Sequence, residues 1–143
     1  MSSKTNTTGR YTLPKAERLA GRSDIGRLFT HGEAFLVYPI KCTCRWTELG
    51  GGVRMMVLVP KRNHKRAVAR NLLKRRMREA YRLHKELLAV EPGEGCAVVG
   101  VDMAFSYVAK GEPLDYRTVE RAMITILQKV SALRAARQAD VQG

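Results

Sequence analysis

The chain has 143 residues, 45% of them hydrophobic, which suffices to bury the core of one ordinary domain and excludes wholesale disorder. It carries 26 Lys and Arg against 13 Asp and Glu, and a net charge of +13 is typical of polyanion-binding proteins. No apolar run approaches the roughly 20 residues of a membrane-spanning helix, and the N-terminus lacks the apolar segment of a secretory signal. We therefore expect a cytoplasmic protein that does not enter a membrane.

The three cysteines predict neither a disulfide framework nor a zinc site. Cys42 and Cys44 are two residues apart, Cys96 stands alone, and the three histidines are dispersed. A structural zinc site needs four ligands at recognisable spacing, which this arrangement does not supply. We expect these cysteines to be small core or strand residues in a reducing compartment.

The N-terminal part predicts a tail followed by a short helix. Residues 1–10 are polar and predict a disordered tail. Ser23 is a suitable N-cap and Gly32 a suitable C-terminal stop. The apolar residues between them fall on one helix face: Ile25, Leu28 and Phe29. Spacing alone favours a core position for Phe29.

The next part of the chain has the pattern of β-strands. Residues 34–47 alternate apolar and polar side chains with a period of two, and Pro39 splits this run into a short edge strand and a longer strand. The glycines at 50–52 predict a turn, and residues 53–59 predict the following strand. We expect the strands on either side of this turn to pair as a hairpin.

The segment from Lys61 to Glu86 carries most of the net charge, with eleven Lys or Arg and two acidic residues, or +9 of the +13. After a loop over about 60–65, we expect a helix over about 66–90. At about 100° per residue, its apolar and basic side chains separate onto two faces. The polar face carries Asn71, Lys74, Arg75, Arg78, Arg82 and Lys85, and Arg70 lies at its boundary with the apolar face.

This basic face differs from an ordinary solvated helix face, which is the alternative interpretation. Solvated faces mix charge signs at a spacing of four residues. Here Arg70, Lys74 and Arg78 follow one another at that spacing, so they repel unless a ligand neutralises them. We interpret the face as a polyanion-binding surface. Arg76 falls outside the basic arc, and we expect it to extend over the apolar face.

The remaining elements complete the fold prediction. Residues 91–95 end the basic helix, and residues 96–103 predict a strand, which gives a strand-helix-strand crossover with two parallel strands. A final helix is expected over about 116–135, followed by a frayed tail over 137–143. The order α-β-β-β-α-β-α predicts an α+β fold, a two-layer sandwich with helices against a small mixed sheet, as one domain over residues 11–136.

The sequence predicts a binding protein without catalytic groups of its own. Its acidic residues are too scattered for a metal nuclease, and no glycine-rich phosphate loop opens a helix. Arginine forks and lysine charges suit phosphate groups. Tyr38 and Trp46 are candidates for stacking on unpaired bases, with core packing as the alternative for both.

One motif of the basic segment matches a known family. Residues 57–62 form a strand that ends in a basic pair, and after a short loop the helix reads Ala67-Val-Ala-Arg70-Asn71-Leu72-Leu-Lys74-Arg75-Arg-Met-Arg78-Glu79. This motif resembles that of the protein component of bacterial ribonuclease P, and the similarity spans about residues 12–133. The family has a second arginine at the position of Leu72, so one expected RNA contact is missing here.

The resemblance implies a ribonucleoprotein enzyme. Its RNA subunit, with magnesium held mainly by that RNA, cleaves the 5′ leader from precursor tRNA. The protein would bind the catalytic RNA and the precursor tRNA, contribute no catalytic residue and be a monomer on its own. A general RNA-binding protein of ribosomal type, with no role in cleavage, is the alternative.

The resemblance also implies site residues and one unusual feature of the topology. RNA would contact Lys61, Arg62, Lys65, Arg66, Arg70, Asn71, Lys74, Arg75, Arg78 and Arg82. The single-stranded leader would lie between the first helix and the sheet, in a cleft lined by Phe29, Arg18 and Tyr38. The family's crossover is left-handed, whereas about 98% of such crossovers are right-handed.

Overall fold

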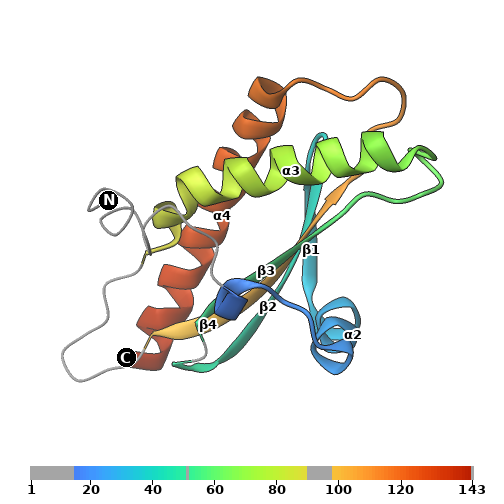
Figure 1. The fold of residues 1–143 in the computed structure, drawn as a ribbon. Helices are drawn as coiled ribbons and strands as arrows, with labels where there is room; N and C mark the ends of the chain where they lie inside the picture. Colours follow the sequence, from blue (N-terminus) through green and yellow to red (C-terminus); the bar gives the residue numbers. More distant parts are fainter. Residues whose placement is uncertain (1–14, 51, 90–97, 143) are drawn as a thin grey trace, which may run out of the picture.

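The computed structural model describes residues 15–50, 52–89 and 98–142, which form a four-stranded sheet and three α-helices (Figure 1). The predicted α+β class and the order α-β-β-β-α-β-α are confirmed. The predicted tail over residues 1–10 and Cys96 lie outside the described residues.

The sheet is mixed, with the spatial order β1-β2-β4-β3. Its strands are β1 (Glu33–Val37), β2 (Ile40–Leu49), β3 (Val53–Leu58) and β4 (Val99–Tyr107). β1 pairs antiparallel with β2, and the connection through Tyr38 and Pro39 confirms that the proline divides a short edge strand from a longer one. β3 and β4 are parallel neighbours, which confirms the predicted pairing of the crossover.

The predicted hairpin between β2 and β3 is wrong, because β4 lies between these two strands. β4 pairs antiparallel with β2 and parallel with β3. Every residue of β4 is buried except the half-buried Ser106. Burial of its apolar side chains therefore stabilises the fold most when β4 is covered on both faces. The Gly50 N–H donates to the carbonyl of Val98 at 2.9 Å, so the glycine turn leads toward β4.

Two long helices cover one face of the sheet (Figure 1). α3 spans Ala67–His84 and passes into a 3₁₀ turn, η2 (Lys85–Leu88), so it ends earlier than the predicted residue 90. α4 spans Tyr116–Gln142, which places its end later than the predicted Ala135. Gln138, inside the predicted frayed tail, is buried, and its side-chain carbonyl accepts a 2.7 Å hydrogen bond from the Val99 N–H.

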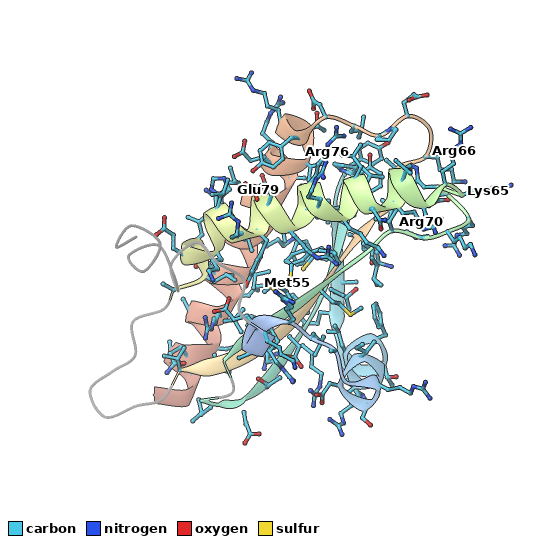
Figure 2. The ribbon with its side chains drawn as sticks, in the orientation of Figure 1. Met55, Lys65, Arg66, Arg70, Arg76 and Glu79 are labelled. Atoms are coloured by element: carbon cyan, nitrogen blue, oxygen red, sulfur yellow. The ribbon has the colours of Figure 1, made fainter. Side chains whose placement is uncertain are left out.

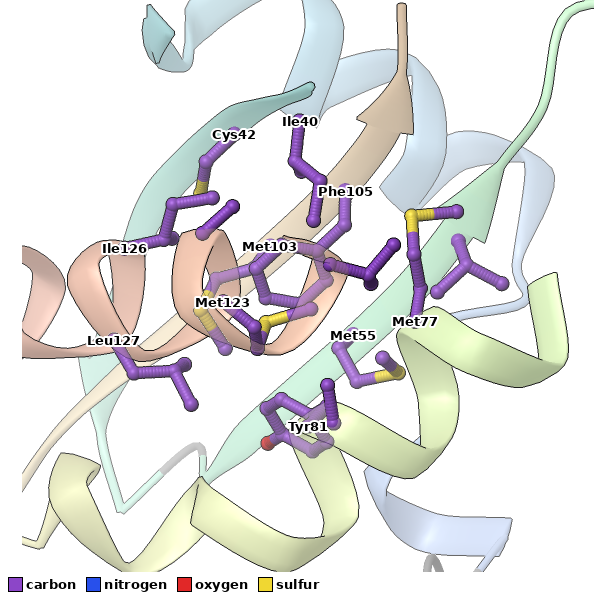
Figure 3. Packing of buried hydrophobic residues seen from close by; sticks show 14 of the residues in the cluster. Ile40, Cys42, Met55, Met77, Tyr81, Met103, Phe105, Met123, Ile126 and Leu127 are labelled. Carbon is purple, nitrogen blue, oxygen red and sulfur yellow. The ribbon is translucent and has the colours of Figure 1, made fainter. Parts of the chain in front are cut away.

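The main core lies between these helices and the sheet (Figure 3). Its large side chains are fully or almost fully buried, and each stabilises the fold by roughly 1.5–3 kcal/mol. They include Ile40, Cys42, Met103 and Phe105 from the sheet, Met77 and Tyr81 from α3, and Met123, Ile126 and Leu127 from α4. Cys42 and Cys44 are both buried and free, as predicted. A hydrogen bond with Cys44, together with burial, raises the pKa of the Cys42 thiol.

The opposite face of the sheet carries the short helix α2 (Arg22–His31), preceded by the 3₁₀ turn η1 (Lys15–Glu17). A second, smaller core joins them to the sheet, made of Leu19, Leu28 and Ala104 with Ile25, Met56 and Leu58 packed around. The N-cap of α2 is Gly21 rather than the predicted Ser23, which lies within the helix. Gly32 ends the helix as predicted, with its N–H donating to the carbonyl of Leu28.

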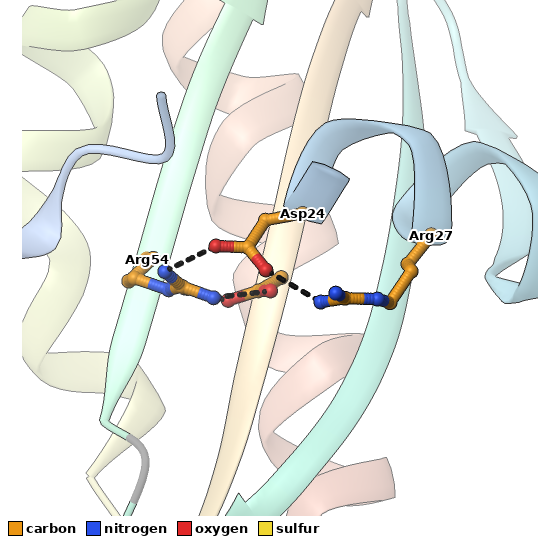
Figure 4. A network of polar contacts seen from close by, with 4 residues as sticks. Asp24, Arg27 and Arg54 are labelled. Atoms are coloured by element: carbon orange, nitrogen blue, oxygen red, sulfur yellow. Dashed lines mark hydrogen bonds and ion pairs between the residues drawn. The ribbon is translucent and has the colours of Figure 1, made fainter. Parts of the chain in front are cut away.

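A charged network fastens α2 to this face (Figure 4). Arg54 of β3 donates two hydrogen bonds to Asp102 of β4, at 2.9 and 2.8 Å, and one to Asp24 of α2 at 3.1 Å. Asp102 is only 1% exposed, and its hydrogen bond raises the pKa of the Arg54 guanidinium. Asp24 also accepts a 2.8 Å bond from Arg27. This network fixes the position of α2 over the sheet.

Candidate nucleic-acid interface

The polar face of α3 is oriented by its apolar face. Leu73, Met77, Ala80 and Tyr81 are all buried against the main core, so the residues between them point away from it. Asn71, Arg75 and Arg78 are exposed, while Lys74 and Arg82 are half-buried. The predicted separation of the helix into an apolar and a basic face is therefore confirmed.

The middle of this face carries positive charge that other side chains do not offset. Lys74, Arg75 and Arg78 form no hydrogen bond and no ion pair with any residue that the structure describes. Three cations within two helical turns raise the local potential and cost stability through their mutual repulsion. An anionic ligand would remove this repulsion.

Arg70 has a different environment at the beginning of the helix (Figure 2). Its Nη1 donates to the main-chain carbonyls of His64 at 2.9 Å and Lys65 at 2.8 Å. Arg70 therefore holds the loop before α3 in place, in addition to any contact with a ligand. The sequence did not reveal this role, because a helical wheel contains no information about the preceding loop.

His64 fastens the same loop to the end of β4. It is buried, its Nε2 donates to the carbonyl of Ala109 at 2.8 Å, and its ring lies 5.5 Å from the ring of Tyr107. In the sequence, His64 is only one of three dispersed histidines, and nothing in its spacing reveals this role. The loop held in this way presents four exposed cations: Lys61, Arg62, Lys65 and Arg66.

The remaining arginines of α3 have partners within the protein. Arg82 donates to the Glu79 carboxylate at 2.7 Å, so one predicted RNA-binding cation already forms an ion pair. Arg76 donates to the carbonyl of Leu114, in the connection before α4, and this agrees with its place outside the basic arc. Leu72, where the resemblance has an arginine, is half-buried and lines a hollow of about 690 Å³ together with Val68 and Pro113.

The structure places Phe29, Arg18 and Tyr38 at separate positions around the sheet. Phe29 precedes β1, whereas Tyr38 follows it, and the five residues of β1 separate the strand ends by roughly 16 Å. Arg18 forms a bridge with Met55 of β3, at the sheet edge opposite β1. The insertion of β4 places β3 and Arg18 away from β1, and a cleft lined by all three residues stays a prediction.

The aromatic candidates differ in how accessible they are. Phe29 is 47% exposed, so the core position favoured by its spacing is wrong. Tyr38 is 64% exposed and available for stacking. Trp46 is half-buried, and the guanidinium of Arg137 from α4 lies 5.3 Å from the centre of its ring. Trp46 is therefore packed against α4.

The described ranges were also searched for metal-binding groups and for membrane-spanning helices. No group of three or more His, Cys, Asp or Glu in these ranges is placed to hold a metal ion. Within the same ranges, no helix combines the length and the apolar character needed to cross a membrane.

Comparison with known proteins gives one consistent family. The family described as "Ribonuclease P" matches residues 13–131. A ribonuclease P protein component from Porphyromonas gingivalis is 41% identical over 126 residues, covering 85% of this chain and 88% of the relative. Another from Chlorobaculum tepidum is 35% identical over 116 residues, covering 71% of each chain.

Solved structures support the same fold. The RNase P protein from Thermotoga maritima superposes with a TM-score of 0.62 and 23% identity, covering 79% of this chain and 96% of that one. The RNase P protein from Staphylococcus aureus gives a TM-score of 0.59 and 18% identity, covering 80% and 95%. At these identities the likeness concerns the fold.

Proposed function

Because this chain belongs to the ribonuclease P protein family, we propose that it works by binding RNA and leaves bond cleavage to its RNA partner. It is the protein subunit of ribonuclease P, an endoribonuclease, and acts in tRNA processing. Its partners are the RNA subunit and the substrate. In this proposal the active site lies on the RNA, and the protein contributes no catalytic residue.

The observation that carries the proposal is the group of cations in the middle of the polar face of α3. Lys74, Arg75 and Arg78 have no partner among the described residues, and the loop before them adds four exposed cations. Guanidinium forks and ammonium groups bind phosphate oxygens strongly. We propose that the RNA subunit lies along this face and contacts Lys61, Arg62, Lys65, Arg66, Arg70, Asn71, Lys74, Arg75, Arg78 and Arg82.

The other face of the sheet is proposed to bind the 5′ leader of the precursor tRNA. Phe29 on α2 and Tyr38 after β1 expose aromatic rings on which unpaired bases can stack. The Arg54 network fixes the position of α2, so Phe29 projects from a rigid support. A protein that holds the leader in this way distinguishes precursor from mature tRNA, since mature tRNA has no leader.

Magnesium belongs to the RNA in this proposal. We assign no magnesium-dependent step to the protein. The protein cations reduce the repulsion between RNA phosphates, and the RNA then needs less magnesium to reach its active form. We also propose that the chain is cytoplasmic and monomeric before it assembles with RNA.

Reconstitution tests the proposal. The purified chain, mixed with its RNA subunit and a precursor tRNA at low magnesium, is expected to raise leader removal above the rate of the RNA alone. The variant Lys74→Glu/Arg75→Glu should lose most of this gain, because two contacts with phosphate become repulsive. Arg117→Glu/Arg121→Glu, an equal change of charge at exposed positions of α4, is the control.

Two results would contradict the proposal. One is no gain in leader removal with the wild-type chain. The other is equal loss in both charge-reversal variants, which would show that the effect depends on total charge and not on α3. Sedimentation of the chain with ribosomal subunits, without any effect on cleavage, would favour the ribosomal-type alternative.

A further inference from the structure

A hollow of about 370 Å³ lies between α3 and the segment that follows η1, and arginines dominate its lining. Four arginines line it together with one carboxylate: Arg18, Arg75, Arg78, Arg82 and Glu79. Arg18 is far from the other three in sequence and reaches them only through the fold. The resemblance places Arg18 with the leader and the α3 arginines with the RNA subunit, whereas the structure puts them around one hollow.

The backbone that carries Arg18 is held on both sides. The Leu19 N–H donates to the carbonyl of Met55 at 2.8 Å, and Leu19 itself is buried in the smaller core. Just before Arg18, Glu17 accepts a 2.9 Å bond from Lys85, whose side chain is 11% exposed. Arg18 therefore belongs to a fixed segment along the edge of β3, next to Met55.

The charges of Arg75 and Arg78 in the lining of the hollow favour an anion. Glu79 pairs with Arg82 at 2.7 Å and so neutralises one of the four guanidinium groups. Arg75 and Arg78 have no hydrogen-bond or ion-pair partner among the described residues. Several guanidinium forks converging from two directions match the tetrahedral oxygens of a phosphate group.

The surroundings favour a phosphate that belongs to an RNA chain. A second hollow of about 280 Å³ shares Arg18 and Arg78 with the first, and apolar residues dominate the rest of its lining, Leu19, Ala20 and Met56 among them. A nucleotide fits these two adjoining hollows, with its phosphate among the arginines of the first and its sugar or base against the apolar lining of the second. The arginines of α3 in this hollow also belong to the polar face that is assigned to the RNA subunit.

We propose that this hollow binds a backbone phosphodiester of the RNA subunit, and that Arg18 completes the site from outside α3. The proposal rests on the proposed function, since it assumes that α3 faces that RNA. Arg18 then fixes the register of the RNA along the helix. It does not act with Phe29 and Tyr38 on the leader, because it lies at the opposite edge of the sheet from Tyr38.

A double-mutant cycle on RNA-subunit binding tests this site. Arg18→Gln and Arg78→Gln are each expected to weaken affinity roughly ten-fold and to reduce the salt slope by about one, as expected for one lost phosphate contact. The double variant should lose less than the product of the two single losses, because both arginines contact the same phosphate. Arg117→Gln, at an exposed arginine near the beginning of α4, is the matched control, and circular dichroism checks that each variant is folded.

Several outcomes would overturn the assignment. If Arg18→Gln binds the RNA subunit as Arg117→Gln does, or if the two single losses simply multiply, the shared site is wrong. If Arg18→Gln changes only the discrimination between precursor and leaderless tRNA, Arg18 belongs to the leader. Stabilisation of the free protein by inorganic phosphate with unchanged RNA affinity would indicate a free-anion site. Failure of the wild-type chain to bind the RNA subunit would contradict the proposed function itself.

Discussion

At the scale of single residues, arginines on one helix have different roles. Arg70 donates to two main-chain carbonyls of the preceding loop, Arg76 donates to the carbonyl of Leu114, and Arg78 has no hydrogen-bond or ion-pair partner among the described residues. Substitution of Arg70 therefore removes structural support for the loop as well as a positive charge. Lys74, Arg75 and Arg78 are better positions for testing RNA contacts separately from folding.

Gly26 and Gly32, in and just after α2, differ in the space that a side chain would have. A Cβ added to Gly32 would collide with the carbonyl oxygen of Leu28 and would lie 2.9 Å from that of Cys44. Both neighbours are backbone atoms, which cannot move aside cheaply. A Cβ on Gly26, in the middle of α2, would meet nothing within 4 Å. Gly32 is therefore required by the close approach of two chain segments, whereas Gly26 is not required by packing.

We predict opposite effects of alanine at these two positions. Gly32→Ala should lower the free energy of unfolding by about 1–3 kcal/mol, because the added methyl group forces the backbone apart. Gly26→Ala should raise it by up to about 1 kcal/mol through better helix propensity. Urea unfolding of both variants measures the two changes. Equal changes in both would show that the contact at Gly32 does not constrain the chain.

At the scale of secondary structure, the beginning of α4 depends on Asp115. Its Oδ1 accepts hydrogen bonds from the Thr118 hydroxyl at 2.7 Å and from the Thr118 N–H at 3.0 Å. These bonds satisfy an amide that the helix itself leaves without a partner. They also lower the pKa of the Asp115 carboxyl, since they favour its charged form.

The lowered pKa predicts how the cap depends on pH. A carboxyl whose pKa is lower in the folded state stabilises the fold above its unfolded pKa of about 3.9, and this contribution disappears as pH falls through the folded pKa. Asp115→Ala should therefore lower the melting temperature at pH 7 and have a smaller effect near pH 3. Glu112→Ala, at an exposed acidic residue in the same connection, is the control. If Asp115→Ala lowers the melting temperature equally at pH 7 and near pH 3, the charge of Asp115 does not contribute to the cap.

At the scale of the whole molecule, positive charge is concentrated on one side of the fold. Residues 61–86 hold +9 of the +13, and the polar face of α3 and the loop before it present most of it. α4, which covers the same face of the sheet, instead buries its apolar residues in the main core. The molecule therefore offers an RNA one strongly cationic surface, built around a single helix.

This concentration predicts a strong effect of salt on RNA-subunit affinity. With roughly six to eight phosphate contacts, affinity should fall by about three to five powers of ten over a fourfold increase in salt concentration. Lys74→Glu/Arg75→Glu should flatten the plot of log affinity against log salt. Filter binding or fluorescence anisotropy between about 50 and 200 mM salt measures the slope. A slope corresponding to only one or two contacts would mean that this surface does not follow the RNA backbone.

Local sequence properties determined the two faces of the basic helix, the division of the first two strands and the family motif. Helix period separates Met77 from Arg75 before any tertiary contact forms, because side-chain direction follows from backbone geometry alone. Pro39 divides two strands since it lacks an N–H for the ladder. The basic motif from Arg70 to Glu79 likewise identified the family, because its residues are contiguous in the chain.

Only the tertiary structure decided the strand order, and several site features follow from that order. β4 lies between β2 and β3 because its apolar residues gain most from burial on both faces, a comparison that no local window contains. The same order carries Arg18 to the edge of β3 beside Arg75 and separates it from Tyr38. The acceptors of Arg70 likewise depend on the loop that His64 fastens to β4. Sequence spacing thus determined which residues are basic and exposed, and long-range packing decided which of them share a site.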